Sequence, residues 1–407
     1  MKLLSTLAIV LALQIGVNAQ GYKVTDFSGG TGPYGMAIDS RGYLWVSNNS
    51  SHTITYNTGG NVKTAAGAQN QAGYTDGQGV GIRFSQPKGI AVTQRAGSEV
   101  LVVADAGNNA IRFVSIANLT TILSTKVTDI TGFNDPCDVE VDASGNIYVA
   151  DRMNYVVKKI DLVGQVTIIA GQEGKSGTDD GDATTKAKFT APTGLYVDGS
   201  DVYVADGGAL RKISGGKVTT IDLKPDDSWG DVGWLFNCLD IEKMGSQWVL
   251  SDGCSIRIFD AGTTKYITMA GANYAGQCGY KNGMDTFARF QNVYTMKYDA
   301  TNEKLLVADQ GNNKIRQIEK TTIAIEEAAV ADFNLYPNPA SDVLVVEGIE
   351  DNFSLSIYNL AGSELISVQS SAAGGSTSID VSNLQQGVYL VSIRQSQGIT
   401  TQKLVIQ

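Results

Sequence analysis

The stretch VVADAGNNAIRF, residues 102–113, sets the pattern for most of this chain. An apolar segment ending in aspartate, a tight polar turn and a second strand-like segment are typical of a β-hairpin. Segments like the first recur at intervals of 46 to 57 residues: WVSN at 45–48, VVAD at 102–105, YVAD at 148–151, YVAD at 203–206, VLSD at 249–252 and LVAD at 306–309. Six copies of one unit predict a repeat architecture.

Each repeat has room for four short strands, and the first of them often begins with Pro-x-Gly, as at residues 33–35, 87–89 and 192–194. Glycine supplies 46 of the 407 residues, which suits a chain with many tight turns. One four-stranded sheet cannot bury both faces, whereas six sheets in a ring bury each against its neighbours. We therefore predict an all-β fold, a six-bladed β-propeller over residues 20–325.

A strand from one end of the repeats can complete the blade at the other end and so close such a ring. Residues 22–27 look like a fourth strand without the three that should precede it. We expect them to complete the last blade, with residues 321–325 as the competitor for that position.

The repeats resemble those of NHL-repeat propellers over residues 21–325. The shared features are the Pro-x-Gly starts, the Val-Ala-Asp turns followed by Asn-x-Ile-Arg, and long loops at 67–84, 171–189 and 271–290 that end in phenylalanine. Blades 5 and 6 depart from the pattern, because Asn237-Cys238-Leu239 and Val293-Tyr294-Thr295 stand in place of Pro-x-Gly. We expect the channel ends of these two blades to differ from the others.

The strand pattern changes after a linker at residues 326–333, and residues 334–407 read as a small Ig-like antiparallel β-sandwich. This tail resembles the C-terminal sorting domain (Por type) of type IX secretion cargo from Bacteroidetes-type bacteria. The matching motif residues are Pro337, Asn338, Pro339, Gly387, Tyr389 and Lys403. The resemblance implies recognition by the type IX secretion machinery, export across the outer membrane, and release or attachment to surface lipopolysaccharide. The alternative is a carbohydrate-binding or purely structural sandwich.

Residues 1–19, MKLLSTLAIVLALQIGVNA, read as a secretory signal peptide, with a basic start, an apolar run and small residues before the cleavage point. The apolar run is short for a membrane anchor, and no later stretch is long and apolar enough to span a bilayer. We expect export through the periplasm to the outer-membrane surface or the medium.

An exported chain meets oxidising conditions, so its four cysteines, Cys137, Cys238, Cys254 and Cys278, can form disulfides. Four cysteines allow three complete pairings. A hairpin turning near residues 244–246 would bring Cys238 and Cys254 together, and we predict that pair, with Cys254–Cys278 as the alternative. A thiolate metal site is less favoured because no partner histidine lies nearby.

Composition excludes several classes of function. The chain has one histidine, His52, so metal sites that need two histidines are excluded. Its net charge of −10 leaves no basic stripe for nucleic acid. No GxSxG nucleophile motif or Walker loop occurs. His52 lies in a polar turn and is expected to be a surface residue; a role as general base is the alternative.

Ligand-binding candidates are expected on the face that carries the Pro-x-Gly starts. The middle positions of these starts include Tyr34, Lys88 and Tyr294, and the connection between blades 4 and 5 holds Trp229 and Trp234. Aromatic rings beside charged groups suit sugar stacking or the capture of a peptide or cation. Ordinary loop packing is the alternative for all five residues.

The aspartates that end the second strands recur in almost every blade, so we interpret them as turn-capping residues. Our functional hypothesis is an exported binding protein, without catalytic residues or cofactor, whose top face engages a protein or a glycan. The alternative is a lactonase-like hydrolase or lyase with Ca²⁺ held in the channel by Asp138 and Asp240.

Overall fold

The computed structural model describes residues 20–119, 122–124, 130–226, 238–260, 264–271, 277–322, 333–349, 353–359, 364–370, 375–395 and 398–407. The signal-peptide prediction therefore falls outside the described residues. The chain separates into two compact units, the larger of which is Val24–Glu319. In the described part, no helix is long and apolar enough to cross a membrane.

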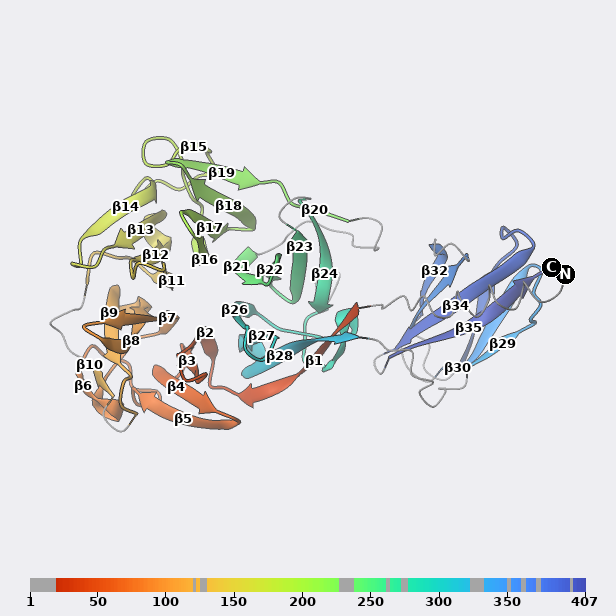
Figure 1. The fold of residues 1–407 in the computed structure, drawn as a ribbon, viewed down its shortest axis with the longest axis horizontal. Helices are drawn as coiled ribbons and strands as arrows, with labels where there is room; N and C mark the ends of the chain where they lie inside the picture. Colours follow the sequence, from red (N-terminus) through yellow and green to blue (C-terminus); the bar gives the residue numbers. More distant parts are fainter. Residues whose placement is uncertain are drawn as a thin grey trace. The chain divides into compact units, whose positions relative to one another are not determined.

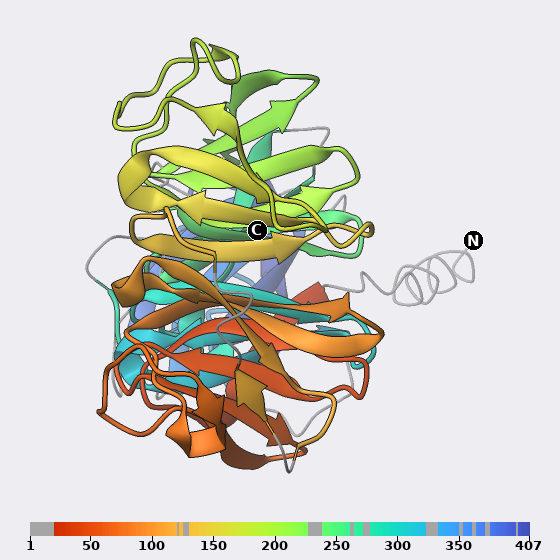
Figure 2. The same ribbon diagram turned by 90° about the vertical axis from the view of Figure 1, so that its left-hand side faces the viewer.

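Six antiparallel sheets of four main strands form a ring over the described residues 20–322 (Figure 1). The first strand of each sheet lies at the centre and contacts the first strands of both neighbouring sheets, so the ring is closed. We number these sheets blades 1 to 6 in chain order. Figure 2 shows successive blades lying one beside the next, from orange through green.

In each blade the four main strands follow one another from the central channel outward. Blades 1 to 3 contain β2 Pro33–Ile38, β3 Leu44–Asn48, β4 Thr53–Thr58 and β5 Asn61–Ala66; β7 Pro87–Arg95, β8 Ser98–Asp105, β9 Ala110–Ser115 and β10 Leu123–Ser124; and β11 Pro136–Val141, β12 Ile147–Asp151, β13 Val156–Ile160 and β14 Val166–Gly171. Blades 4 to 6 contain β16 Pro192–Asp198, β17 Asp201–Asp206, β18 Ala209–Ser214 and β19 Lys217–Ile221; β21 Cys238–Met244, β22 Gln247–Asp252, β23 Ser255–Asp260 and β24 Lys265–Gly271; and β26 Val293–Asp299, β27 Lys304–Asp309, β28 Lys314–Thr322 and β1 Gln20–Gly29.

Short additional elements edge the blades and form turns within them. Two-residue strands pair with the outermost strand of four blades: β6 Gly77–Gln78, β15 Gly181–Asp182, β20 Lys224–Pro225 and β25 Gly283–Met284. The 3₁₀ turns are η1 Gly79–Gly81, η2 Ala106–Asn108, η4 Arg152–Asn154, η6 Asp285–Phe287 and η7 Gln310–Asn312. Three of these turns, η2, η4 and η7, directly follow a second strand that ends in aspartate.

The N-terminal strand closes the ring, as the sequence predicted. β1 lies beside β28 as the fourth main strand of blade 6. Asp26 on β1 forms an ion pair with Lys314 (3.0 Å), and the Gln317 side-chain amide donates a hydrogen bond to the Thr25 hydroxyl (3.1 Å). The competing segment begins as the end of β28, the third strand of the same blade.

Hydrophobic side chains fill the spaces between consecutive blades. Between blades 1 and 2, for example, the buried cluster includes Trp45, Ile54, Phe84 and Leu101. The Pro-x-Gly glycine allows the first strands to approach closely: a Cβ on Gly35 would collide with the backbone of Lys88 in the next blade. Only glycine fits such a contact without moving a strand.

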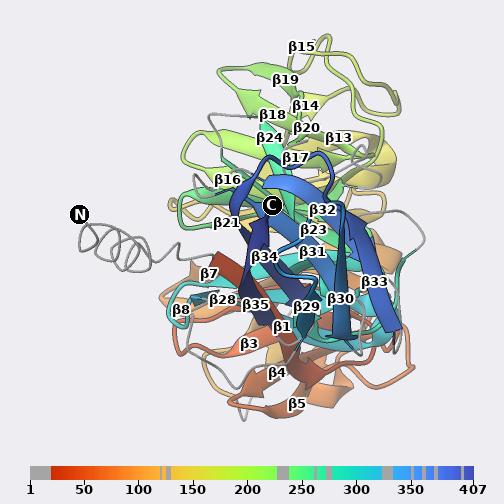
Figure 3. The ribbon, with the colours of Figure 1, turned by 90° about the vertical axis from the view of Figure 1, so that its right-hand side faces the viewer.

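The C-terminal unit is a sandwich of two antiparallel sheets, drawn in blue in Figure 3. One sheet holds β29 Asn334–Tyr336, β30 Val343–Ile349 and β33 Gly375–Asp380; the other holds β31 Phe353–Tyr358, β32 Glu364–Ser370, β34 Gly387–Gln395 and β35 Gly398–Ile406. A single buried cluster, which includes Leu344, Leu355, Val391 and Leu404, provides its core. The alternating exposure along β34 is typical of strands with one buried face.

Residues of the predicted sorting motif are joined to one another in this sandwich. The Asn338 side chain donates to the Lys403 carbonyl (2.8 Å) and accepts a hydrogen bond from the Val405 amide (2.9 Å). The Tyr389 hydroxyl donates to the Gln385 carbonyl (2.6 Å). The Pro337–Pro339 segment is thereby attached to the last strand of the chain.

Candidate functional site

The aspartates at the ends of the second strands hold the blades together. In blade 2, Asp105 is fully buried and accepts hydrogen bonds from the Ser85 amide (2.7 Å), Asn108 (2.8 Å) and Arg112 (2.9 Å). The Arg112 guanidinium lies over the Phe84 ring, 5.3 Å from its centroid. We call this carboxylate–cation pair, with the aromatic ring beneath the cation, the blade clamp.

The blade clamp recurs in five of the six blades at one register position. In blades 2 to 6 the cation lies on the third strand, opposite the second strand, which ends in the aspartate. The five pairs are Asp105–Arg112, Asp151–Lys158, Asp206–Arg211, Asp252–Arg257 and Asp309–Arg316. The carboxylates therefore have a structural role, although the amides that they cap belong mostly to the loop entering the blade. Tyr74 and Tyr280, from two of the long loops, lie against the clamp arginines Arg112 and Arg316.

The predicted top-face residues do meet at the mouth of the central channel. Tyr34 and Tyr294 stack with ring centroids 4.6 Å apart, and the Lys88 ammonium lies 5.9 Å from the Tyr34 centroid. Lys88 also forms an ion pair with Asp135, which is paired in turn with Arg152 (2.8 Å). Aromatic rings and charged groups from blades 1, 2, 3 and 6 thus gather in one place. Trp229 and Trp234 lie outside the described residues.

The electrostatics of the mouth favour a compact cluster with one excess positive charge. Burial opposes ionisation of Asp135, but hydrogen bonds and charge from Lys88 and Arg152 lower the pKa of its carboxyl. Burial raises the pKa of the Tyr34 hydroxyl well above its usual range, so this ring stays neutral. Two cations therefore share one carboxylate, and Arg152 keeps a two-fifths exposed side chain that faces solvent.

Sequence reasoning did not foresee Asp135 and Arg152 as members of this cluster. Each lies next to a recognised motif, Asp135 just before Pro136-Cys137-Asp138 and Arg152 just after the third Val-Ala-Asp. Their blade counterparts carry other residue types, and this departure from the repeat was a usable signal.

The cysteine pairing predicted from the hairpin is wrong. The disulfide joins Cys254 to Cys278, the alternative, and links the β22–β23 turn of blade 5 to the long loop before blade 6. Cys238 does lie across the hairpin, opposite Asp252, but its side chain is fully buried in the core between blades 4 and 5. Cys254 lies beyond the paired residues, in the turn, where it meets the loop.

Cys137 and Cys238 are both free and buried. Burial raises the pKa of the Cys137 thiol to about 11 and that of Cys238 well above its usual range, so both are poor nucleophiles. The strand register also corrects the alignment of blade 5, since Cys238 occupies the proline position and Leu239 the middle one.

Asp138 and Asp240 occupy equivalent positions on blades 3 and 5, where blades 1, 2 and 4 have Gly35, Gly89 and Gly194. Each accepts a hydrogen bond from an amide of the next blade, Asp138 from Leu195 (2.8 Å) and Asp240 from Met296 (2.7 Å). Burial, with a contribution from Glu140, raises the pKa of Asp138 to about 8. Burial and the Asp138 charge raise the pKa of Asp240 well above its usual range.

These two carboxyl groups do not fit the calcium site of our alternative hypothesis. A Ca²⁺ ion takes six to eight oxygen ligands and favours ionised carboxylates. Here each group is engaged by a backbone amide and held towards its neutral form. Within the described residues, no group of three or more His, Cys, Asp or Glu side chains could hold a metal. Metal analysis of the purified protein tests whether a cofactor is needed.

Two residues beyond Asp138 and Asp240 on the same strands, Glu140 and Glu242 belong to an ion triad that crosses the channel. Lys297 on blade 6 pairs with Glu140 on blade 3 and with Glu242 on blade 5, each at 3.2 Å. Blades 3 and 6 lie on opposite sides of the ring (Figure 1), so Lys297 bridges the channel. Burial works against its charge, but Glu140 and Glu242 raise the pKa of Lys297 well above its usual range. Sequence reasoning missed these residues, because a lone lysine four positions beyond a strand start gives no signal.

His52 has a structural contact. Its Nδ1 accepts a hydrogen bond from the Gln86 amide (3.0 Å), and its backbone adopts a positive φ of 62°. The ring is partly exposed in the turn after β3, and it joins blade 1 to the start of blade 2. This geometry favours the structural interpretation over a general base.

Residues 334–407 match the family model of the secretion system C-terminal sorting domain. Protein SUPPRESSOR OF QUENCHING 1, chloroplastic, of Arabidopsis thaliana is 24% identical over 293 residues. That match covers 62% of this chain and 27% of the plant protein, so this chain spans about a quarter of that relative.

Solved structures with similar folds include a virginiamycin B lyase from Staphylococcus aureus, with 12% identity and a TM-score of 0.48, covering 73% of this chain and 99% of that one. A gluconolactonase from Xanthomonas campestris has 14% identity and a TM-score of 0.49, covering 74% and 90%. PorZ, a type IX secretion component of Porphyromonas gingivalis, has 12% identity and a TM-score of 0.43, covering 91% and 51%.

The tail match indicates export by type IX secretion, to the cell surface or beyond it. The chain is thus a β-propeller followed by a secretion system C-terminal sorting domain.

Proposed function

We propose that this protein is an exported binding protein whose channel mouth engages an acidic group presented by a protein or a glycan. The observation that carries the proposal is the convergence of the Tyr34–Tyr294 stack with Lys88, Asp135 and Arg152. Aromatic rings beside cations provide both an apolar contact and a partner for an anionic group.

Three further observations support binding over catalysis. The lone histidine accepts a backbone hydrogen bond, both free thiols are buried with raised pKa values, and the channel below the mouth is crossed by the Lys297 triad. A channel that is bridged below its mouth is suited to a protruding group of a larger ligand. The sorting tail would deliver this surface outside the cell, with release or attachment to lipopolysaccharide as the two outcomes.

The test is a glycan and peptide array probed with the full exported chain and with the Lys88→Met variant. Loss of the Lys88 charge-assisted bond should weaken binding of an acidic ligand by about 1.5–3 kcal/mol, or roughly 10- to 150-fold. Lys217→Met is the matched control, because Lys217 is an exposed lysine at the start of β19, outside the mouth. An array hit that binds wild type and Lys88→Met equally would remove the mouth from the account.

A further inference from the structure

Blade 1 is the one blade of the described ring without a blade clamp. At the register position of Arg112, opposite Val46, it carries Thr55, and at the position of Asp105 it carries Asn48. The Asn48 amide donates to the Thr55 hydroxyl at 3.0 Å, so a neutral pair replaces the ion pair. The chain also enters this blade through the short segment between β1 and β2 instead of a long loop ending in phenylalanine.

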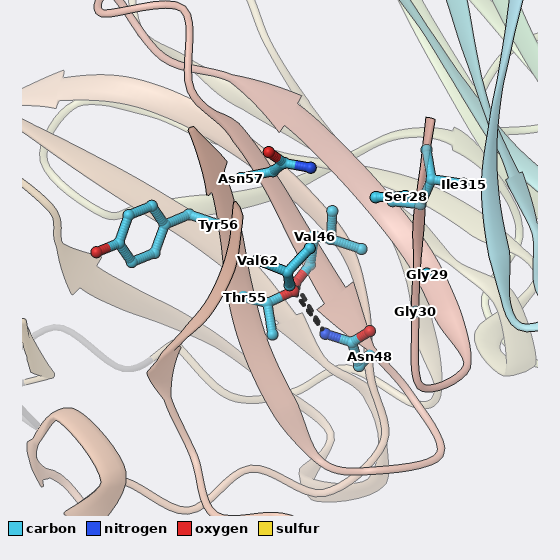
Figure 4. Close-up of a pocket in the computed structure, with 10 residues that line it drawn as sticks. All are labelled: Ser28, Gly29, Gly30, Val46, Asn48, Thr55, Tyr56, Asn57, Val62 and Ile315. Carbon is cyan, nitrogen blue, oxygen red and sulfur yellow. Dashed lines mark hydrogen bonds between the residues drawn. The ribbon is translucent and has the colours of Figure 1, made fainter. Parts of the chain in front are cut away.

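Without a cation and a covering loop, an open cleft remains between blade 1 and the end of β1. We call it the blade 1 notch (Figure 4). Its outer part has a volume of about 260 Å³, and a narrow inner recess of about 10 Å³ adjoins it. The inner recess has room for about one small group such as a hydroxyl.

The inner recess holds two polar groups that lack partners. Asn57 is only 4% exposed, its Oδ1 accepts the Gly60 amide (2.8 Å), and its Nδ2 makes no hydrogen bond within the described residues. The buried Ser28 Oγ is likewise without a partner there. In Figure 4 the Asn57 amide nitrogen points towards the side formed by Ser28. Leaving such a donor unpaired costs about 1–3 kcal/mol, so this recess favours a ligand with an acceptor.

The chemistry of the walls limits what that ligand can be. None of the lining residues is charged; hydroxyl and amide groups from Asn48, Thr55 and Thr64 alternate with the apolar side chains of Val46, Val62 and Ile315. A cation would lack the carboxylate that it meets in the other blades, and an anion would lack a counter-charge. The outer volume lies below the roughly 300–1,000 Å³ of sites for drug-sized ligands.

We propose that the blade 1 notch binds one neutral monosaccharide unit of a glycan. The ring would occupy the outer part against Val62, and one hydroxyl would enter the recess, which Ile315 also lines, to accept from Asn57 Nδ2 and bond to Ser28 Oγ. This site is separate from the channel mouth and does not rest on the function proposed for it.

The probes are free glucose, galactose, mannose and N-acetylglucosamine, and saturation-transfer NMR measures the binding of each to the full exported chain. At least one should bind saturably with a dissociation constant on the order of 1 mM. Two variants remove the site in different ways: Asn48→Asp with Thr55→Arg rebuilds the clamp of the other blades, and Asn57→Asp keeps the acceptor for Gly60 but deletes the donor. Both should weaken binding at least about tenfold, the effect of one lost hydrogen bond.

Thr219→Ala, an exposed threonine of blade 4, is the matched control and should bind like wild type. Unchanged unfolding midpoints show that the variants still fold, and Lys88→Met should leave sugar binding intact, which separates this site from the mouth. The proposal is overturned if no neutral sugar binds, if glucuronic acid or triglycine binds in preference, or if the rebuilt clamp leaves sugar binding unchanged.

Discussion

Replacing Arg112 by methionine should destabilise the propeller strongly, because it breaks a blade clamp from one side. Arg112 and Asp105 are both fully buried, and they are joined at 2.9 Å. Removing one partner of a buried ion pair typically costs about 3–5 kcal/mol, since the other charge stays buried and unpaired. The same change also removes the guanidinium that lies over Phe84.

The size of this loss should depend on pH. Burial raises the pKa of Asp105 to about 6, and Arg112 is among the groups that hold it from rising further. In the variant this carboxyl is therefore protonated in the folded state at about pH 5 and needs no partner, whereas at about pH 7.5 it must ionise or stay protonated at a cost of about 1.4 kcal/mol per pH unit. The free energy lost on substitution should thus be larger at the higher pH.

Urea unfolding of the full chain, followed by fluorescence, measures the effect. The matched control is Thr55→Ala at the equivalent position of blade 1, which should cost only about 1 kcal/mol. The double variant Asp105→Asn with Arg112→Thr copies the neutral pair of blade 1 and should be at least about 1 kcal/mol more stable than Arg112→Thr alone. A loss for Arg112→Met as small as that for Thr55→Ala, or a double variant less stable than Arg112→Thr, would contradict the stabilising role of the clamp.

Three other predictions follow from the described contacts. Burial raises the pKa of Asp138 to about 8, so this group favours folding while it is protonated, and its contribution falls as pH rises from about 4 to 8. Relative to Asp138→Asn, the wild type should lose up to about 1.4 kcal/mol of unfolding free energy per pH unit over this range. Parallel curves of stability against pH for the two proteins would contradict this. Cys254→Ser should lower the free energy of unfolding by about 3 kcal/mol, because it releases a 24-residue loop, and Cys278→Ser should lower it equally. Non-reducing peptide mapping that finds Cys254 bonded to another cysteine would refute the pairing. A chain that ends at residue 333 should accumulate in the periplasm in cell fractionation, and its appearance at the cell surface would show that the tail is dispensable.

Much of the fold was readable because each blade repeats the same local signals. Val-Ala-Asp before a tight turn marks the second strand in four blades, and Ile-Arg marks the third strand in blades 2, 5 and 6, so the repeat predicts the order of the strands. Closure by β1 was also predictable, since residues 22–27 have a fourth-strand pattern and no blade of their own.

The parts that sequence did not predict depend on side-chain direction or on contacts across the ring. Cys238 lies where the hairpin argument placed it, but its side chain enters the blade core. Lys297 reaches Glu140 across the channel, a contact between blades three repeats apart. The blade 1 notch did have a signal, because Thr55 stands where other blades have arginine or lysine, but its meaning required the observed register.

The most direct test of the account is the affinity of the exported chain for its best acidic array ligand, measured by calorimetry for wild type, Lys88→Met and Lys217→Met. Binding at the channel mouth predicts a loss of roughly 10- to 150-fold for Lys88→Met and none for Lys217→Met. Equal affinities for all three proteins would contradict a ligand site at the mouth.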